Sequence, residues 1–220
     1  MFNSQKHVFW QALLVTILIF SIGIISGIII ENWRTNKISD LYQQSELNLL
    51  DIKLQSEIYS LGSFNCDEAV RENIEFADKI FEEAKILDRY EKASRLTDSL
   101  LVEHKKYDLL RTTLLLNSIK IKETCNNNYY EVVYFYDYND PSLDIKAKQK
   151  VFSRLLNELK SRKGSEILLI PIAGDNEISS INLLLNQFNV KESELPVILI
   201  DRKTKVTELQ TIEDLLKYFN

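Results

Sequence analysis

The chain has 220 residues, of which 45% are hydrophobic and 27% are charged, and its formal net charge at pH 7 is −5. Only five residues are Gly and three are Pro, about 4% of the chain, against roughly 12% in average proteins. This scarcity excludes a collagen-like chain, a flexible Pro/Gly linker and an all-β fold with closely spaced turns. No Gly or Pro lies between Ser63 and Asp140. The chain therefore divides into an apolar N-terminal segment, a long helical region and a C-terminal part that contains turns.

The apolar segment, residues 8–30, follows a short tail of residues 1–7 and carries no charged side chain. At 1.5 Å per helical residue it is long enough to cross a bilayer. It ends in Ile-Ile-Ile-Glu-Asn-Trp, which offers no small-residue cleavage site of a secretory signal. Trp10 and Trp33 bracket it as interfacial aromatics do. We therefore predict an uncleaved transmembrane signal anchor, with the lipid bilayer as a partner.

The basic residues on the two sides of this anchor nearly balance. Lys6 and the α-amino group precede it, and Arg34 and Lys37 follow it. We expect a single-pass protein of the cell membrane with a cytoplasmic N-terminus and the bulk of the chain outside the cytoplasm, because of the cysteines described below. Gly23 and Gly27 form a small-xxx-small pattern that would allow two spans to approach closely as a homodimer. The alternative is that these glycines only reflect the frequency of Gly in membrane helices.

Residues 31–125 are rich in helix-forming residues, and their apolar spacing predicts a stalk of three antiparallel helices. Gly62 and Ser63 separate the first helix from the second, which Asn65 or Asp67 caps. The turn between the second and third helices is expected at 94–98. The apolar stripes are as follows: Ile38, Leu41, Leu50, Leu54, Ile58 and Leu61 in the first helix; Val70, Ile74, Ala77, Phe81, Ala84 and Leu87 in the second; Leu96, Leu100, Tyr107, Leu110, Leu114 and Ile121 in the third.

The two cysteines fit this hairpin. The midpoint of Cys66 and Cys125 is 95.5, inside the predicted turn, so an antiparallel hairpin brings both thiols to the same height at its open end. A disulfide between them would stabilise the fold by about 4 kcal/mol on the chain-entropy model. Disulfides persist outside the cytosol, which favours export of this region. The alternative is two free buried thiols in a cytosolic protein.

The C-terminal part alternates short strands and helices. The order β-α-β-α-β-β-α is predicted from strands at 131–136, 166–172, 197–200 and 206–209 and from helices at 140–163, 178–188 and 211–219. Asp140 is the expected N-cap of the first of these helices, with Pro141 in its first turn and Gly164 after its end. Thr211 is expected to cap the last helix.

This element order, with Pro196 directly before the third strand, resembles the thioredoxin fold over residues 129–220. In that family the proline is cis and faces the active site, so the resemblance implies a cis-proline loop at Leu195 and Pro196. The family's Cys-x-x-Cys motif begins the first helix, where a helix N-terminus lowers the pKa of a thiol. The corresponding residues are Asp140, Pro141, Ser142 and Leu143, and none is a cysteine. The fold class is thus α plus α/β: a transmembrane helix, a helical stalk and a thioredoxin-like domain without the redox motif.

No catalytic, metal or cofactor motif is present in the sequence. His7 lies at the membrane boundary, and His104 is expected to be solvated or packed on the third helix. The cysteines and His104 lack the spacing of zinc ligands. Lys146, Lys148, Lys150 and residues 160–163 give the first helix of the C-terminal domain a basic face. In a chain of negative net charge, this face is interpreted as solvated, and no nucleic acid is expected as a partner.

Tyrosines dominate the first strand of the C-terminal domain. Alternation places Tyr134, Tyr136 and Tyr138 on one face. They either pack under the flanking helices or form an aromatic surface near Pro196 that binds a peptide or protein.

Two functional hypotheses follow. The preferred one is a non-enzymatic, membrane-tethered thioredoxin-like module that binds another protein or serves envelope assembly. The alternative is a membrane-bound thiol-disulfide oxidoreductase that uses Cys66 and Cys125. A signalling receptor is a third class, but only seven residues precede the span.

Overall fold

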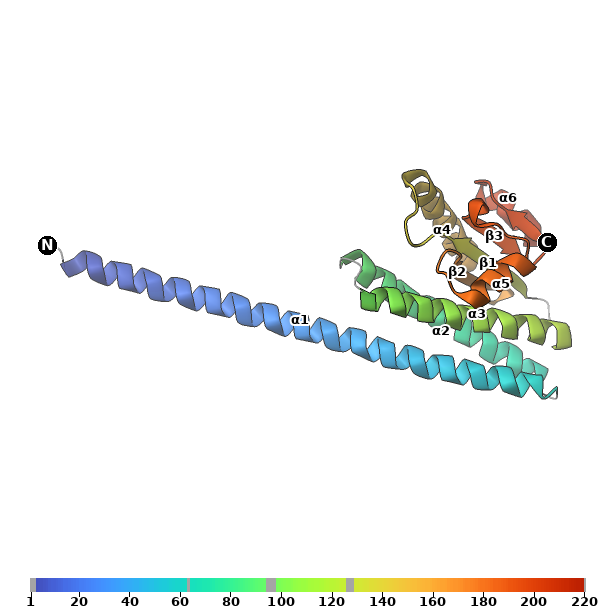
Figure 1. Cartoon of the computed structure of the whole chain (residues 1–220), viewed down its shortest axis with the longest axis horizontal. Helices are drawn as coiled ribbons and strands as arrows, with labels where there is room; N and C mark the ends of the chain where they lie inside the picture. Colours follow the sequence, from blue (N-terminus) through green and yellow to red (C-terminus); the bar gives the residue numbers. More distant parts are fainter. Residues whose placement is uncertain (1–2, 63, 94–97, 126–128, 220) are drawn as a thin grey trace. The chain divides into compact units, whose positions relative to one another are not determined.

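The computed structural model describes residues 3–62, 64–93, 98–125 and 129–219, and the chain divides into two compact units between Gln44 and Ser45. Figure 1 labels the elements. The α-helices are α1 (Asn3–Ser60), α2 (Cys66–Ala93), α3 (Asp98–Cys125), α4 (Leu143–Lys163), α5 (Ser179–Gln187) and α6 (Ile212–Leu216). The strands are β1 (Tyr130–Tyr136), β2 (Ile167–Ala173), β3 (Val197–Ile200) and β4 (Thr204–Val206).

The first unit holds the N-terminal part of α1. Among the described residues, one segment is long and apolar enough to cross a membrane, His7–Trp33, and none of it is buried within the chain. A Cβ atom added at Gly23 or Gly27 would meet nothing within 4 Å. The apolar segment therefore has a surface suited to lipid along its whole length.

In the second unit, the end of α1 packs against α2 and α3. The Asn48 amide donates hydrogen bonds to the Glu83 carboxylate, and the Asn117 amide donates one to the Ile52 carbonyl oxygen. One predicted stripe is wrong here. Leu50, Leu54, Ile58 and Leu61 are exposed. The helix instead turns another set of side chains inward: Ser45, Asn48, Ile52 and Tyr59. The Ser45 hydroxyl donates a hydrogen bond to Glu103 and the Asn48 amide donates to Glu83, contacts that leucines could not make, while Ile52 and Tyr59 join the buried apolar clusters.

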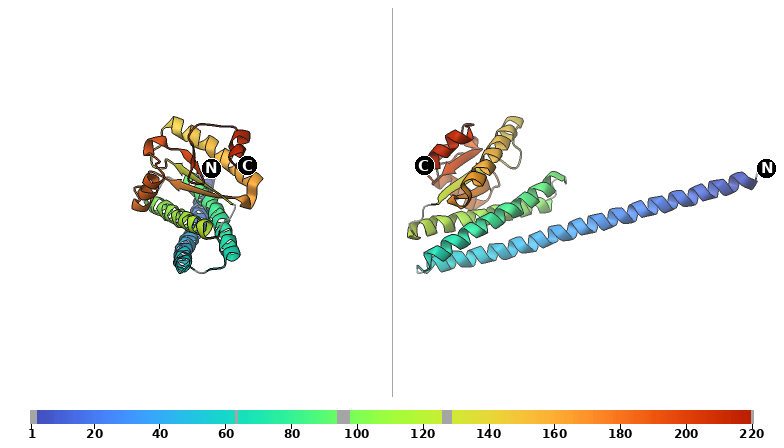
Figure 2. Two further views of the ribbon diagram at one scale, coloured as in Figure 1. Left: turned by 90° about the vertical axis from the view of Figure 1, so that its right-hand side faces the viewer. Right: turned by 180° about the vertical axis from the view of Figure 1, so that it is seen from behind.

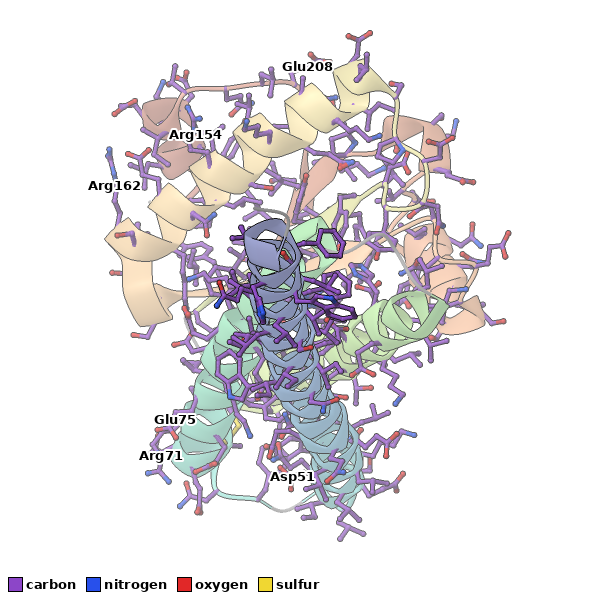
Figure 3. The ribbon with its side chains drawn as sticks, turned by 90° about the vertical axis from the view of Figure 1, so that its left-hand side faces the viewer. Asp51, Arg71, Glu75, Arg154, Arg162 and Glu208 are labelled. Atoms are coloured by element: carbon purple, nitrogen blue, oxygen red, sulfur yellow. A yellow bond between two sulfur atoms is a disulfide. The ribbon has the colours of Figure 1, made fainter. Side chains whose placement is uncertain are left out.

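The stripes of α2 and α3 face the core where their side chains are described. Ala77 on α2 and Tyr107, Leu110, Leu114 and Ile121 on α3 are buried, and Val70, Ile74 and Phe81 are half-buried against the cores. Leu87, Leu96 and Leu100 lie outside the described side chains. Charged residues such as Arg71 and Glu75 project outward from α2 (Figure 3), whereas Glu103, Asp108 and Arg111 of α3 are buried.

The ends of these helices follow the predicted signals where the chain is described. Asn65, rather than Asp67, caps α2, because its side-chain oxygen accepts the N–H groups of Asp67 and Glu68 at 3.0 and 3.3 Å. Gly62 has a φ of +85°, a left-handed conformation suited to glycine after a helix end. Most of the turn expected at 94–98 lies outside the described residues.

The sheet is mixed, with strand order β2-β1-β3-β4. β1 pairs with β2 in parallel and with β3 in antiparallel orientation, and β4 pairs antiparallel with β3. The predicted order of strands and helices is confirmed, although β4 is displaced to Thr204–Val206. β2 is therefore an edge strand, and β1 lies inside the sheet.

Helices cover both faces of this sheet. Val133 and Phe135 share a core with the α1–α3 bundle and with α5, whereas Val132 and Tyr134 share one with α4 and α6. Figure 2 shows α4 and α6 on the side of the sheet away from α2 and α3. The helices named as a stalk thus form one face of the same folded unit as the sheet.

One predicted helix cap is wrong. The N-cap of α4 is Ser142, whose hydroxyl accepts the N–H of Ile145 at 3.3 Å, and Asp140 and Pro141 precede the helix. Gly164 ends this helix and Thr211 caps α6, both as predicted.

Candidate functional site

The Cys66–Cys125 disulfide is present and joins the first residue of α2 to the last residue of α3. It packs beside a small buried cluster that includes Tyr59 and Ile121. The end of α3 that carries Cys125 lies beside the amino end of β1, because Lys122 donates a hydrogen bond to the Tyr129 carbonyl oxygen at 2.8 Å.

The residues that correspond to the redox motif lie at the other end of β1. Asp140 and Leu143 are exposed, Pro141 is buried, and Ser142 is engaged as the helix cap. None of these four side chains is a thiol.

The Leu195–Pro196 peptide bond is cis. Leu195 packs tightly on Gly174, where an added Cβ would lie 2.9 Å from Leu195 Cδ1. Val197, the residue after Pro196, pairs with Phe135 near the end of β1. The loops after β1 and β2 and the loop before β3 therefore meet at one corner of the sheet.

Helix α3 brings a polar cluster to this corner. His104 Nε2 lies 2.9 Å from the Tyr136 hydroxyl and 3.5 Å from Asp108 Oδ2. The imidazole ring stacks on Tyr138, with ring centroids 3.5 Å apart. Arg111 Nη1 donates a hydrogen bond to Asp108 Oδ1 at 3.2 Å. His104, Asp108 and Arg111 follow one another at helical intervals of four and three, so they share one face of α3.

Asp108 is the centre of this cluster and is fully buried. It also accepts a hydrogen bond from the Ala173 N–H and one from the Asn176 amide. Burial raises the pKa of the Asp108 carboxyl, and the neighbouring charges of His104 and Arg111 oppose that shift. The carboxylate thus orients the basic groups on either side of it and fixes the loop after β2.

These side chains open onto a cavity of about 430 Å³, a size that falls within the range of ligand sites. Its lining comes from α2, α3, α4, β1 and β2: Phe81, Ala84, Lys85, His104, Arg111, Tyr134, Tyr136, Tyr138, Gln149, Ser153, Leu156, Asn157, Leu169 and Pro171. The three predicted tyrosines do share one face. Tyr134 is buried, and burial raises the pKa of its hydroxyl. Tyr136 and Tyr138 are half-buried.

An acidic pair lies beside the cavity, in the loops after β1 and β2. The Asp175 carboxylate accepts the N–H groups of Tyr138 and Asn139 at 2.8 and 2.7 Å. Burial, a hydrogen bond with Asp175 and the charges of nearby carboxylates raise the pKa of Asp137 to about 6. The two loops are thus joined through a carboxylate pair whose charge changes near neutral pH.

Sequence reasoning missed the grouping of His104 with the tyrosines. The helical spacing of His104, Asp108 and Arg111 is visible in the sequence, but Tyr136, the partner of His104 on β1, is 32 residues away along the chain. Only the packing of α3 along the sheet brings the two sets together.

Two further observations bound the site. Within the described ranges, no group of three or more His, Cys, Asp or Glu side chains is arranged to hold a metal ion. The predicted basic face of α4 is partly neutralised, since Lys160 pairs with Asp78 at 2.7 Å and Lys163 with Glu166 at 3.0 Å.

Comparison with known proteins finds no protein family, no curated protein and no solved structure that matches the chain.

Proposed function

We propose that the chain is a membrane-anchored binding module, in which a thioredoxin-like domain without redox thiols presents the cavity at the carboxyl end of β1 to a protein partner. The four-stranded mixed sheet with helices on both faces is compatible with that fold. The apolar segment His7–Trp33 acts as a single-pass anchor, with its N-terminus in the cytoplasm. The observation that carries the proposal is the cavity, where Tyr136, Tyr138 and Arg111 gather beside the edge strand β2. Leu195 and Pro196 are not among the described residues that line it.

The position of the disulfide supports a binding role rather than a redox one. Cys125 and His104 are 21 residues apart on α3, about 30 Å at 1.5 Å per residue. A redox pair needs access to its substrate, whereas Cys66 and Cys125 lie away from the cavity and beside a buried cluster. A structural disulfide should resist mild reductant in the folded protein, and a catalytic one should be reduced readily.

Photo-crosslinking of the full chain in its membrane tests the binding role. A benzophenone amino acid replaces Tyr138 at the cavity or Leu143, which is 85% exposed at the start of α4. Leu209, which is 51% exposed after β4, serves as the matched control. We expect the same adduct from positions 138 and 143 and none from 209. No adduct, or an equal adduct from 209, would overturn the proposal.

Thiol labelling tests the proposed orientation. In intact cells, Cys66 and Cys125 should react with a membrane-impermeant reagent only after reduction, because they are paired and outside the cytoplasm. Labelling of both thiols without reductant, and only after lysis, would show a reduced cytosolic pair and contradict the model of an exported domain.

A further inference from the structure

The cavity runs along the outer edge of β2. Leu169 and Pro171 of this strand line it, between Phe81 and Lys85 on α2 and Ser153 on α4. β2 pairs with β1 on its other side, so this edge is the end of the sheet. An edge strand offers backbone N–H and C=O groups for pairing with another chain.

The direction of these backbone groups follows from their neighbours. The Gly174 N–H donates inward to the Tyr136 carbonyl oxygen, and the Ala173 N–H donates outward to Asp108. The backbone N–H and C=O groups of odd-numbered residues in β2 therefore point to the outer edge, because successive backbone groups of a strand point to alternate sides. Pro171, which has no N–H, is tolerated at such an edge position.

Both ends of this edge are already occupied. Lys160 Nζ donates a hydrogen bond to the Ile167 carbonyl oxygen at 3.2 Å, and Asp108 accepts the Ala173 N–H at 3.2 Å. Lys160 also pairs with Asp78 on α2, which links α4 to α2 past the strand. In the described part of the chain, the outward N–H and C=O of Leu169 and the C=O of Pro171 have no hydrogen-bond partner within the fold, and Leu169 as a whole is 7% exposed.

Three basic side chains, Lys85, His104 and Arg111, line the cavity, and none of the described lining residues is Asp or Glu. Lys85 pairs with Glu82 at 2.7 Å, and Asp108 lies against both His104 and Arg111. The recognition of an added anion therefore depends on the further donors of Arg111. Arg111 is only 6% exposed. Within the described residues it donates one hydrogen bond, from Nη1 to Asp108. The guanidinium has five N–H donors in a planar fork that suits a carboxylate.

We propose that the cavity binds an extended peptide segment of the partner, which pairs with the outer edge of β2 at residues 169–171 and places an acidic side chain against Arg111. Backbone pairing supplies affinity and the carboxylate supplies selectivity, as in other modes of strand addition. The Tyr136 and Tyr138 side chains border the bound segment. This inference rests on the proposed binding function and names the chemistry of the partner.

Selection from two peptide libraries tests the proposal. The full chain in lipid nanodiscs is incubated with capped pentapeptides that are randomised around a central Glu or, in the matched library, a central Gln. Retained peptides are then measured by mass spectrometry. We expect at least tenfold greater retention from the Glu library, and no displacement by free glutamate at the concentration of the peptides. Equal retention of the two libraries would overturn the acidic peptide, and equal displacement by free glutamate would overturn the pairing along β2.

Two variants locate the binding. The double variant Asp108→Asn with Arg111→Gln keeps a neutral hydrogen-bonding pair and should abolish the preference for Glu. Ser153→Trp fills the cavity from α4 and should abolish retention of both libraries, while Asn182→Trp on the exposed face of α5 should leave retention unchanged.

Unchanged retention by folded Ser153→Trp would place the binding elsewhere. If position 138 still crosslinks while the libraries are retained equally, the binding module stands and the acidic peptide fails.

Discussion

The two ends of β1 differ in how they are closed. At the amino end, the disulfide joins α2 to α3, Arg202 pairs with the fully buried Glu131 at 3.1 Å, and Lys122 pairs with Asp201 at 2.6 Å. At the carboxyl end, side chains of α2, α3 and α4 line a cavity together with the tyrosines of β1 and of the loop after it and with the edge of β2. Covalent and ionic links thus join the elements at one end of β1, and a cavity bordered by a buried polar cluster lies at the other.

Among the variants below, removal of the disulfide should lower the free energy of unfolding the most. The double variant Cys66→Ala with Cys125→Ala frees a loop with a sequence separation of 59 residues, which the chain-entropy model equates with about 4 kcal/mol. Urea unfolding of the full chain in detergent, followed by circular dichroism, measures the loss. Peptide retention under native conditions should persist, because the disulfide does not contact the cavity. Loss of retention in a variant that remains folded would show that the two ends are coupled.

Arg202→Ala, at the same amino end of β1, should lower the free energy of unfolding by about 3 kcal/mol, because it removes the paired cation of the buried Glu131 carboxylate. The charge of Arg202 and the hydrogen bond from Ser118 both lower the pKa of Glu131, against the larger effect of burial. Arg154→Ala is the matched control, since Arg154 projects from α4 into solvent (Figure 3). The same unfolding assay applies, and an equal loss in the two variants would contradict the role of the ion pair.

Because of Asp137, at the carboxyl end of β1, the stability of the protein should depend on pH. Asp137 has a pKa raised to about 6 in the fold, from its ordinary value of 3.8. The folded state therefore binds this proton more tightly than the unfolded state does. The resulting stabilisation is present below about pH 4 and is lost as the pH rises through 6. Asp137→Asn should raise the free energy of unfolding more at pH 7.5 than at pH 4. This difference between the two pH values should be about 1 kcal/mol larger for Asp137→Asn than for the exposed control Glu208→Gln. The same difference at both pH values would contradict the carboxylate pairing.

The sequence predicted the elements that depend on local chemistry. Asn65 before α2, Gly164 after α4 and Thr211 before α6 act through hydrogen bonds or backbone angles within a few residues. The pairing of the cysteines also followed from the sequence, because a hairpin of two equal helices fixes which residues meet at its open end.

Predictions of which face of a helix is buried were less accurate. Leu50 and Leu54 have helical spacing, yet α1 turns Asn48 and Ile52 inward. The hydrogen bonds that Asn48 makes to α2 come from residues more than 30 positions away. Periodicity alone detects a stripe, but it does not tell which stripe finds partners.

The sequence by itself determined the apolar span, the helical hairpin with its disulfide, and the order of strands and helices, because periodicity, capping and chain length act locally. The tertiary structure decided that α3 lies along the sheet with His104 beside Tyr136 and Arg111 facing the edge of β2. These contacts join residues far apart in the chain, and their geometry depends on how two packed layers settle against each other. The cavity is a product of that packing.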